Sequence, residues 1–251
     1  MLAEVTKFFT KLDKINCLVD SSGIETFPFN CTPADFLEFA ESDLKKGDIQ
    51  APANSLGHAK RAIDCQLDYF LKTYGLSKVS EKERWTTSKK ISLLDSLGIV
   101  PESILHRVNK ARNEFEHRYD LPNVLTAEIS IDIVGLFIAA TDLYLFPARY
   151  GTYFEISNQS ENMPDKTKPI RLSDILKEPL NNDYVHLSLL QDDAILAETH
   201  ISGISLEDTV SSVEDLNNYL YLLTFILHSH RIYGPNSQKF FEKLKYTRPN
   251  T

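Results

Sequence analysis

The chain has 251 residues, 42% of them hydrophobic, and a formal net charge of -8 at pH 7. This length and composition are enough to bury the core of one large domain or two ordinary ones, so they are not typical of a disordered protein. The acidic balance argues against a protein that coats nucleic acid with its whole surface, although it allows a local basic patch.

Three further features bear on where the chain resides and what it binds. Its three cysteines form no CxxC pair and no Cys/His spacing of a zinc site, which indicates reduced thiols and predicts neither a metal nor another cofactor. The N-terminal stretch lacks the apolar core and cleavage site of a signal peptide. The most apolar run, 131–146, contains Asp132 and Asp142 and falls short of the ~18 to 20 uncharged residues of a membrane-spanning helix. We therefore expect a cytoplasmic protein with no membrane partner.

The first 32 residues contain a short amphipathic segment, whose Phe8 and Phe9 we interpret as a packing face, and then an irregular stretch. Beyond it, apolar residues recur at helical spacing between helix start and stop signals. Thr32 before Pro33, for example, is typical of a helix start. The expected helices cover 33–46, 52–74, 87–97, a segment opened by Pro101 and ended by Pro122, and 124–146, with a charged loop at 77–86.

The helix expected over 124–146 is apolar around most of its circumference, so we expect it to be the most buried of the five. After residue 147 the pattern changes to the period-two alternation of strands. Asp192 and Asp193 provide a hairpin turn between the last two strands. The expected elements are strands over 152–157, 184–190 and 194–201, helices over 213–231 and 238–245, and a flexible segment over 158–168.

The predicted fold is therefore mostly α, with a helical bundle followed by a smaller α+β domain. Its three parts are an N-terminal segment (1–32), the bundle (33–147) and a C-terminal domain of unknown role (148–251).

Basic residues are concentrated in one part of the bundle. Between His58 and Arg118 the sequence has twelve Lys and Arg against eight Asp and Glu, a surplus of +4, so the rest of the chain carries -12. This asymmetry can steer a polyanion to the bundle, provided that the bases cluster in three dimensions. It is equally typical of a solvated helix face.

The segment 108–119 reads V-N-K-A-R-N-E-F-E-H-R-Y and places an arginine, Arg112, five residues before a histidine, His117. A histidine with a pKa of about 6.5 can accept or donate a proton at neutral pH. An arginine can bind two phosphate oxygens and stabilise the charge of a transition state. The pair is therefore suited to cleaving RNA without a metal ion, although the same residues also fit a solvated helix end with a C-terminal histidine.

Helical geometry constrains how this pair can act. Five residues at ~100° each place Arg112 and His117 about 140° apart, so one copy of the helix does not bring them together. Asn113 and His117 share a face, so the amide can orient the imidazole. Arg112 and Glu116 share another face and can instead form a surface ion pair.

Three stretches of the bundle, F-L-E-F-A-E-S-D-L-K-K-G-D, A-K-R-A-I-D-C-Q-L-D and above all A-R-N-E-F-E-H-R-Y, resemble the HEPN superfamily of small helical bundles. The motif of that family is an arginine, usually followed by a polar residue, and then a histidine after four to six positions. Arg112, Asn113 and His117 match it, and Glu116 supplies the polar or acidic residue that often precedes the histidine. The resemblance covers somewhat under half of the chain.

This resemblance implies a metal-independent endoribonuclease, an RNA hydrolase of a toxin, defence or stress system, with RNA as its substrate and a restraining protein partner. Family members typically form homodimers in which two motifs build one composite site, which would resolve the 140° offset. In such a site Arg112 would stabilise the transition state and His117 would act as general acid or base, with Asn113 and Glu116 in support.

The acidic residue Asp64 lies where related proteins often have one and would orient the arginine, unless it forms an ion pair with Lys60 or Arg61 or is simply solvated. Candidates for contacting RNA near the motif are His106, Arg107, Lys110 and Arg118.

Two other functions fit the same sequence. One is a non-catalytic HEPN-like dimerisation or adaptor protein whose C-terminal domain binds a protein partner. The other is nucleotidyl transfer, which the lack of a Gly-rich phosphate loop or a paired-carboxylate metal motif disfavours.

Overall fold

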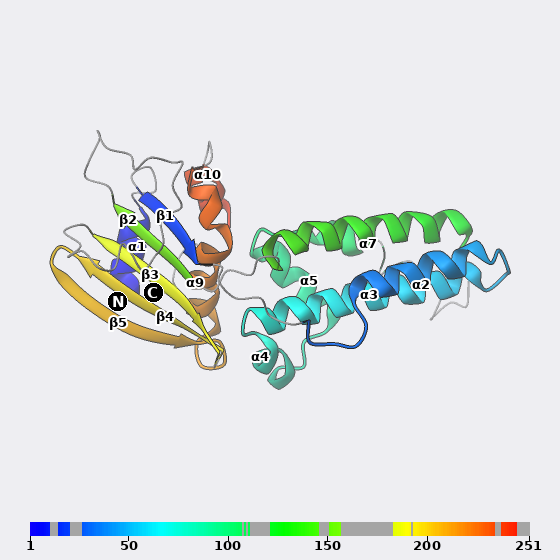
Figure 1. The fold of residues 1–251 in the computed structure, drawn as a ribbon, viewed down its shortest axis with the longest axis horizontal. Coiled ribbons are helices and arrows are strands. Elements are labelled where there is room, and N and C mark those ends of the chain that lie inside the picture. Colours follow the sequence, from blue (N-terminus) through cyan, green and yellow to red (C-terminus); the bar gives the residue numbers. More distant parts are fainter. Residues whose placement is uncertain are drawn as a thin grey trace. The chain divides into compact units, whose positions relative to one another are not determined.

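The structure is a computed structural model, and its described residues fall into two compact units (Figure 1). Most of the described residues are helical, and the strands form one antiparallel sheet. The helical unit comprises Glu25–Thr73 and Val79–Phe146, and the sheet unit comprises Met1–Ile24, Tyr74–Lys78 and Pro147–Thr251. The structure describes residues 1–10, 15–20, 27–106, 108, 110, 121–145, 151–156, 183–191, 193–233 and 237–244.

Long helices form the body of the helical unit. α3 (Ala51–Thr73) packs along both α2 (Pro33–Lys45) and α7 (Val124–Leu145), and the shorter α5 (Thr87–Ser96) also lies against α3 (Figure 1). Each of these helices confirms its expected range to within about one residue at either end. α3 is the central helix of this unit.

Side-chain hydrogen bonds explain why α2 begins at Pro33. The Thr32 hydroxyl accepts from the Asp35 backbone N–H (3.1 Å), and the Asp35 carboxylate accepts from the Thr32 N–H (2.7 Å), which is a capping box. These bonds, the one from the Thr32 backbone first, hold the pKa of Asp35 below its usual value. Pro33 stands at the first helical position, where its missing N–H costs no hydrogen bond.

α7 is not the most buried helix, and that expectation was wrong. Thirteen residues of α3 are buried against eight of α7. On the outer side of α7, Leu125, Leu136 and Leu143 are 62%, 72% and 71% exposed. The expectation failed because α7 is apolar on all sides, whereas α2 and α3 cover only one side of α7.

The expected loop at 77–86 instead contains a short helix, α4 (Ser77–Lys82). Val79 and Ser80 are buried, and the backbone N–H of Trp85 donates to the Ser80 carbonyl (2.9 Å) after the helix. The prediction was wrong because a six-residue helix has too few apolar positions to display a helical period.

The described residues of the sheet unit form five strands in the spatial order β1 (Ile15–Asp20), β2 (Gly151–Ile156), β3 (Tyr184–Leu190), β4 (Ala194–Ile201) and β5 (Ile204–Ser211). Every neighbouring pair is antiparallel. The predicted hairpin is confirmed, with Asp193 at a positive φ of 58° in the turn. β1 and β5 were not predicted, and the expected flexible segment 158–168 lies outside the described residues.

Helices α1 (Leu2–Phe9) and α9 (Leu216–His228) cover one face of the sheet. The Phe9 ring stacks on Phe225 of α9 (3.7 Å between ring centroids) and meets the edge of Phe154 of β2 (4.9 Å). The packing role expected for Phe9 is therefore confirmed. α9 begins three residues later than expected, because the Asp215 side chain caps it, and ends in a 3-10 turn, Ser229–Tyr233; α10 (Ser237–Lys243) follows.

The opposite face of the sheet carries polar and aromatic side chains. Alternation places Tyr153 of β2, His186 of β3 and Glu198 of β4 in one row across this face. Tyr184 and His200 form the next row. The sheet therefore has one apolar face under helices and one face with titratable groups.

The segment Tyr74–Lys78 leaves the helical unit and joins the sheet unit through close contacts. Gly75 has a φ of +59°, and a β-carbon there would lie 2.7 Å from the Tyr219 hydroxyl oxygen. The Gly75 carbonyl accepts from the Ser212 hydroxyl (2.7 Å). Lys78 forms an ion pair with Asp193 (2.8 Å). Glycine at position 75 is thus required both by the backbone conformation and by space.

Candidate functional site

The predicted motif lies outside the described residues, so its geometry is not part of the structure. This holds for Arg112, Asn113, Glu116 and His117, and also for two RNA-binding candidates, Arg107 and Arg118. The structure describes the segment that leads to the motif: residues 102–106, 108 and 110 are helical.

Glu102 anchors this leading segment. Its backbone N–H donates to Asp95 (3.1 Å), and its carboxylate accepts from the Ser92 hydroxyl (2.8 Å) and contacts His106 Nε2 (2.5 Å). The contact with His106, followed by that with Ser92, lowers the pKa of Glu102. His106, a candidate for RNA contact, is therefore held by an acidic neighbour.

Apolar burial fixes the other side of the same segment. Leu105 and Val108 are both almost fully buried. Lys110, the other RNA-binding candidate in the described part, is exposed. The chain that enters the motif is thus bound to the core of the helical unit on one side and carries polar residues on the other.

Asp64, the acidic residue expected near the arginine, has two described partners. Its carboxylate accepts from Lys60 Nζ (2.5 Å), one turn earlier on α3, and from the Thr87 hydroxyl (2.8 Å) at the start of α5. Asp64 therefore ties α3 to α5 and forms the ion pair with Lys60 that the sequence left open.

Several bases of the +4 segment have acidic partners. Lys89 pairs with Glu83 (2.7 Å) and Lys90 with Asp68 (2.5 Å), in addition to the Lys60 and Lys78 pairs. Surface pairs of this kind contribute little stability, but they reduce the positive potential available to a polyanion.

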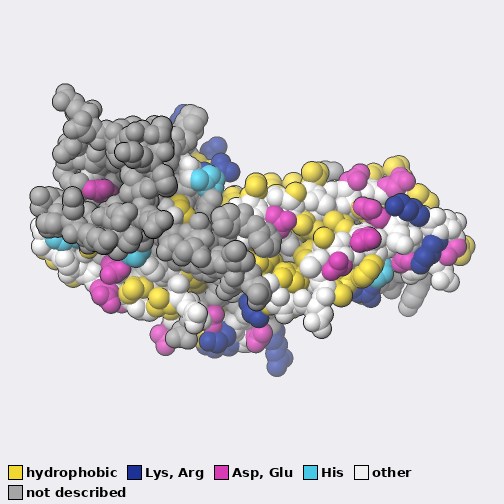
Figure 2. Space-filling view, in the orientation of Figure 1, with side chains coloured by type: hydrophobic (Ala, Val, Ile, Leu, Met, Phe, Trp, Pro, Cys, Tyr) yellow, Lys and Arg dark blue, Asp and Glu magenta, His cyan; other side chains and the backbone are white. Residues whose placement is uncertain are grey.

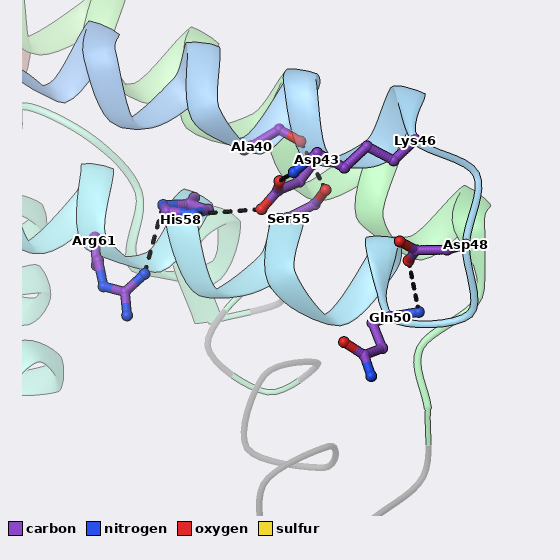
Figure 3. A network of polar contacts seen from close by, with 8 residues as sticks. All are labelled: Ala40, Asp43, Lys46, Asp48, Gln50, Ser55, His58 and Arg61. Carbon is purple, nitrogen blue, oxygen red and sulfur yellow. Dashed lines mark hydrogen bonds and ion pairs between the residues drawn. The ribbon is translucent and has the colours of Figure 1, made fainter.

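A second arginine and histidine pair occurs on α3, and sequence reasoning missed it (Figure 3). His58 Nδ1 lies 3.5 Å from the Arg61 guanidinium, and His58 Nε2 lies 3.4 Å from the Asp43 carboxylate of α2. An arginine donates only, so Nδ1 accepts and Nε2–H faces Asp43. The spacing of three residues on one helix face was the signal that could have revealed this cluster.

The rest of this network joins α2 to α3. The Ser55 hydroxyl donates to the Ala40 carbonyl (2.7 Å) in the buried contact of the two helices, and Lys46 pairs with Asp43 (2.5 Å) (Figure 3). Asp43 is thus shared between a lysine and a histidine. These contacts explain how α2 and α3 are held together.

An apolar stripe runs along the outer side of α7 (Figure 2). Its members follow one another in steps of four and three residues, the spacing of a coiled-coil seam. By length and composition α7 also meets the requirements of a membrane-spanning helix, with a mean hydropathy of 1.8 over 18 residues. The stripe consists of Leu125, Ile129, Asp132, Leu136, Ala139 and Leu143.

No group of three His, Cys, Asp or Glu side chains in the described part of the chain is close enough to hold a metal ion. Comparison with models of protein families, with curated protein sequences and with solved structures gave no match.

Proposed function

We propose that the chain is a metal-independent endoribonuclease of HEPN type that works as a cytoplasmic homodimer. The observation that carries this proposal is the motif Arg112-x4-His117, with Asn113 between the two residues. Its support from the structure is indirect: the segment that enters the motif is helical and is packed against the core of a helical unit.

The chemistry follows from the two side chains. A base removes the proton from a ribose 2'-hydroxyl, whose oxygen attacks the adjacent phosphorus. The bond from phosphorus to the 5'-oxygen breaks, and an acid returns a proton to that oxygen. His117 serves as the base or the acid, while Arg112 stabilises the additional negative charge on the phosphoryl oxygens. The products are a 2',3'-cyclic phosphate and a 5'-hydroxyl.

Electrostatics restrict where RNA would bind. Lys60, Lys89 and Lys90 are engaged by carboxylates, so they add little net positive charge to the surface. We therefore expect the RNA contacts to depend on the bases around the motif, Arg107, Lys110 and Arg118. The acidic remainder of the chain predicts modest affinity that falls as salt rises.

A second copy of the chain fits the apolar stripe of α7. Two identical stripes can pair in antiparallel fashion about a two-fold axis, because the steps of four and three residues match in both directions. Leu125 would then lie opposite Leu143 of the partner subunit. Asp132 would lie within the seam, and a polar residue there selects one register at some cost in stability.

The size of the stripe indicates that α7 does not form the interface alone. Burying a leucine or isoleucine side chain completely contributes about 1.5–3 kcal/mol. At ~25 cal/mol per Å² this energy corresponds to roughly 60–120 Å² of apolar area per side chain. The exposed apolar side chains of α7 thus offer roughly 200–350 Å², whereas a stable interface buries about 800 Å² per partner. Surfaces beside α7 must supply the rest of the buried area. The motif closely precedes α7 in the sequence.

End-group analysis of cleaved RNA tests the proposal. Total RNA is incubated with the purified full-length protein in EDTA, and the new ends are examined for 2',3'-cyclic phosphate. Arg112→Ala and His117→Ala should each slow cleavage by at least ~100-fold, the usual contribution of an acid or base. The matched variants Arg61→Ala and His58→Ala remove the other arginine and histidine pair and should leave the rate unchanged.

Three outcomes would overturn this assignment. Undiminished cleavage by Arg112→Ala or His117→Ala removes the motif from the mechanism. Loss of cleavage only in the His58 and Arg61 variants moves the site to α3. A wild-type protein that dimerises through α7 without cutting RNA supports the adaptor function, which the exposed stripe favours independently.

A further inference from the structure

Three side chains on the polar face of the sheet form a hydrogen-bonded series. Ser188 Oγ lies 3.1 Å from His186 Nε2, and His186 Nδ1 lies 2.7 Å from the Glu198 carboxylate. Each nitrogen of His186 therefore has one partner among the described residues, and these partners are a hydroxyl and a carboxylate. This is the order of groups that activates a serine in acyl-transfer enzymes.

The sheet explains why these residues meet. Ser188 follows His186 by two positions on β3, so both side chains stand on the same face. Glu198 is the direct partner of His186 in the register of β3 and β4. On the other side of β3, Ser188 pairs with Gly151 of β2, which has no side chain to cover the hydroxyl.

The two contacts of His186 determine the direction of the hydrogen bonds. A carboxylate accepts only, so Nδ1 carries the hydrogen and donates it to Glu198. Nε2 of the neutral ring is then an acceptor, and the Ser188 hydroxyl donates to it. His186 is thus oriented as a base toward Ser188, with Glu198 holding the ring in place.

Tyr153 adds a hydrogen-bond donor with no described partner. Tyr153 of β2 stands opposite His186 of β3, with 6.2 Å between the two ring centroids, and is only 1% exposed. Its hydroxyl is buried and makes no hydrogen bond within the described part of the chain. Burial raises its pKa, so the hydroxyl stays protonated. Such an orphaned donor is costly unless a ligand oxygen satisfies it.

We propose that Ser188 is a nucleophile toward carboxylic esters, with His186 as its base, Glu198 as a positioning residue and Tyr153 as the donor to the carbonyl oxygen. Ser188 Oγ forms a bond to the carbonyl carbon while its proton passes to His186 Nε2. The bond to the alcohol oxygen then breaks, and His186 returns the proton to the leaving alcohol. Water later hydrolyses the acyl-serine by the reverse sequence.

The same face of the sheet contains a second serine and histidine pair, Ser205 and His200, that serves as a control for the proposal. His200 Nδ1 lies 2.9 Å from the Ser205 hydroxyl, so a second serine and histidine pair exists. The described contacts of His200 include Ser205 and the stacked Tyr184 ring but no carboxylate. The proposal therefore requires Ser188 to react and Ser205 to remain inert.

The first test uses the unmodified full-length protein and an alkyl fluorophosphonate probe. Attack by Ser188 forms the oxygen–phosphorus bond and expels fluoride, and the serine proton passes to His186. Intact-protein and peptide mass spectrometry should find one adduct, located on Ser188. Absence of an adduct, or an adduct on another residue, overturns the proposal without relying on any variant.

Variants and a chromogenic ester then test the role of each residue. Turnover of 4-nitrophenyl butyrate should disappear in Ser188→Ala and fall by at least ~100-fold in His186→Ala. Glu198→Gln should lower kcat at least ~10-fold with little change in KM, and Glu198→Asp should recover most of that loss. Ser205→Ala should match the wild type. Equal turnover in wild type and Ser188→Ala overturns the proposal.

This inference is independent of the proposed ribonuclease activity. All four residues belong to the sheet unit, whereas the motif belongs to the helical unit. His117→Ala should therefore keep full esterase activity, and Ser188→Ala should keep full RNA cleavage. Failure of either activity leaves the other assignment unaffected.

Discussion

The hydroxyl of Tyr219 in α9 donates to the backbone carbonyl of Tyr74 over 2.8 Å, in a fully buried contact of the sheet unit. Burial raises the pKa of Tyr219, so this donor keeps its proton throughout the ordinary pH range. The bond holds the segment that leaves α3 against α9. Residues 145 positions apart in the sequence are thus joined by one hydroxyl.

Removal of that hydroxyl should destabilise the protein. Tyr219→Phe deletes the donor and leaves its ring, so we expect a loss of about 1–2 kcal/mol in the free energy of unfolding. Tyr221→Phe is the matched control, because the Tyr221 hydroxyl contacts Thr6, whose own hydroxyl also donates to Leu2. That variant should lose at most ~1 kcal/mol. Urea unfolding followed by circular dichroism measures both, and equal losses would contradict the special role of Tyr219.

A β-carbon at position 75 should be tolerated far less than one at position 57. Gly75 has a positive φ, and an added β-carbon would lie 2.7 Å from the Tyr219 hydroxyl and 3.0 Å from the Asp193 backbone. Gly75→Ala should therefore cost roughly 2 kcal/mol or more in the free energy of unfolding. Gly57 lies inside α3 with open space around its β-position. Gly57→Ala should stabilise the protein by about 0.5–1 kcal/mol. Urea unfolding measures both variants, and the two changes in the free energy of unfolding should have opposite signs.

The start of α2 should make stability depend on pH in the acid range. The folded pKa of Asp35 lies below the unfolded value of 3.8, so the capping box is fully formed above that pH and is lost as the pH falls through the folded pKa. Thr32→Ala removes the hydroxyl contact, the smaller of the two Thr32 contacts that lower the pKa of Asp35, and leaves the larger contribution of the Thr32 backbone N–H. We expect unfolding measurements between pH 5 and 2.5 to show a smaller acid dependence in the variant than in the wild type.

Thr86→Ala provides the comparison for this effect. Thr86 caps α5 by accepting from the Lys89 N–H. In α5 the position that Asp35 takes in α2 is occupied by Lys89, so no carboxylate titrates there. Loss of the Thr86 cap should lower stability by a similar amount at every acid pH. A change in acid dependence as large as that of Thr32→Ala would show that the capping box is not its source.

Local signals in the sequence were enough to place α2, α3, β3 and β4. Thr32 and Pro33 mark a helix start by their own chemistry, and the alternation in 184–190 and 194–201 reflects one buried face per strand. β1 was missed because Ile15–Asp20 becomes a strand only by pairing with β2, more than 130 residues away. β5 was missed because most of its residues are exposed on both faces, so no alternation marks it.

The two candidate sites, the motif and the series on the sheet, also differ in how far local sequence signals reveal them. Arg112 and His117 could be proposed from the letters alone because their spacing resembles the motif of the HEPN superfamily. The series on the sheet was missed, although the hairpin predicted between 184–190 and 194–201 has a register that places His186 opposite Glu198. What no local pattern shows is which side of α7 the other helices cover, because both sides are apolar.

The two surface thiols of the helical unit should react at different rates. Cys65 lies beside Cys31 and donates weakly to its carbonyl (3.4 Å), and burial raises the pKa of the Cys65 thiol to about 11. Because the thiolate is the reactive form, Cys65 should react slowly with iodoacetamide at pH 8, and about tenfold faster for each pH unit up to pH 10. Peptide mass spectrometry measures the rate at each site. Exposed Cys31 should be alkylated first, and faster alkylation of Cys65 at pH 8 would contradict its protonated state.

A charge on the stripe of α7 should dissociate the proposed homodimer. Leu136 is 72% exposed, so Leu136→Glu costs the free chain little, whereas in a paired seam it would bury a carboxylate without a partner. We expect the variant to be monomeric by light scattering at concentrations where the wild type is dimeric. Ile49→Glu is the matched control, because Ile49 is 75% exposed but belongs to the loop that joins α2 to α3 and is not a member of the stripe. A dimer that survives Leu136→Glu, or a wild type that is monomeric and binds lipid vesicles through α7, would refute pairing between two copies of this stripe.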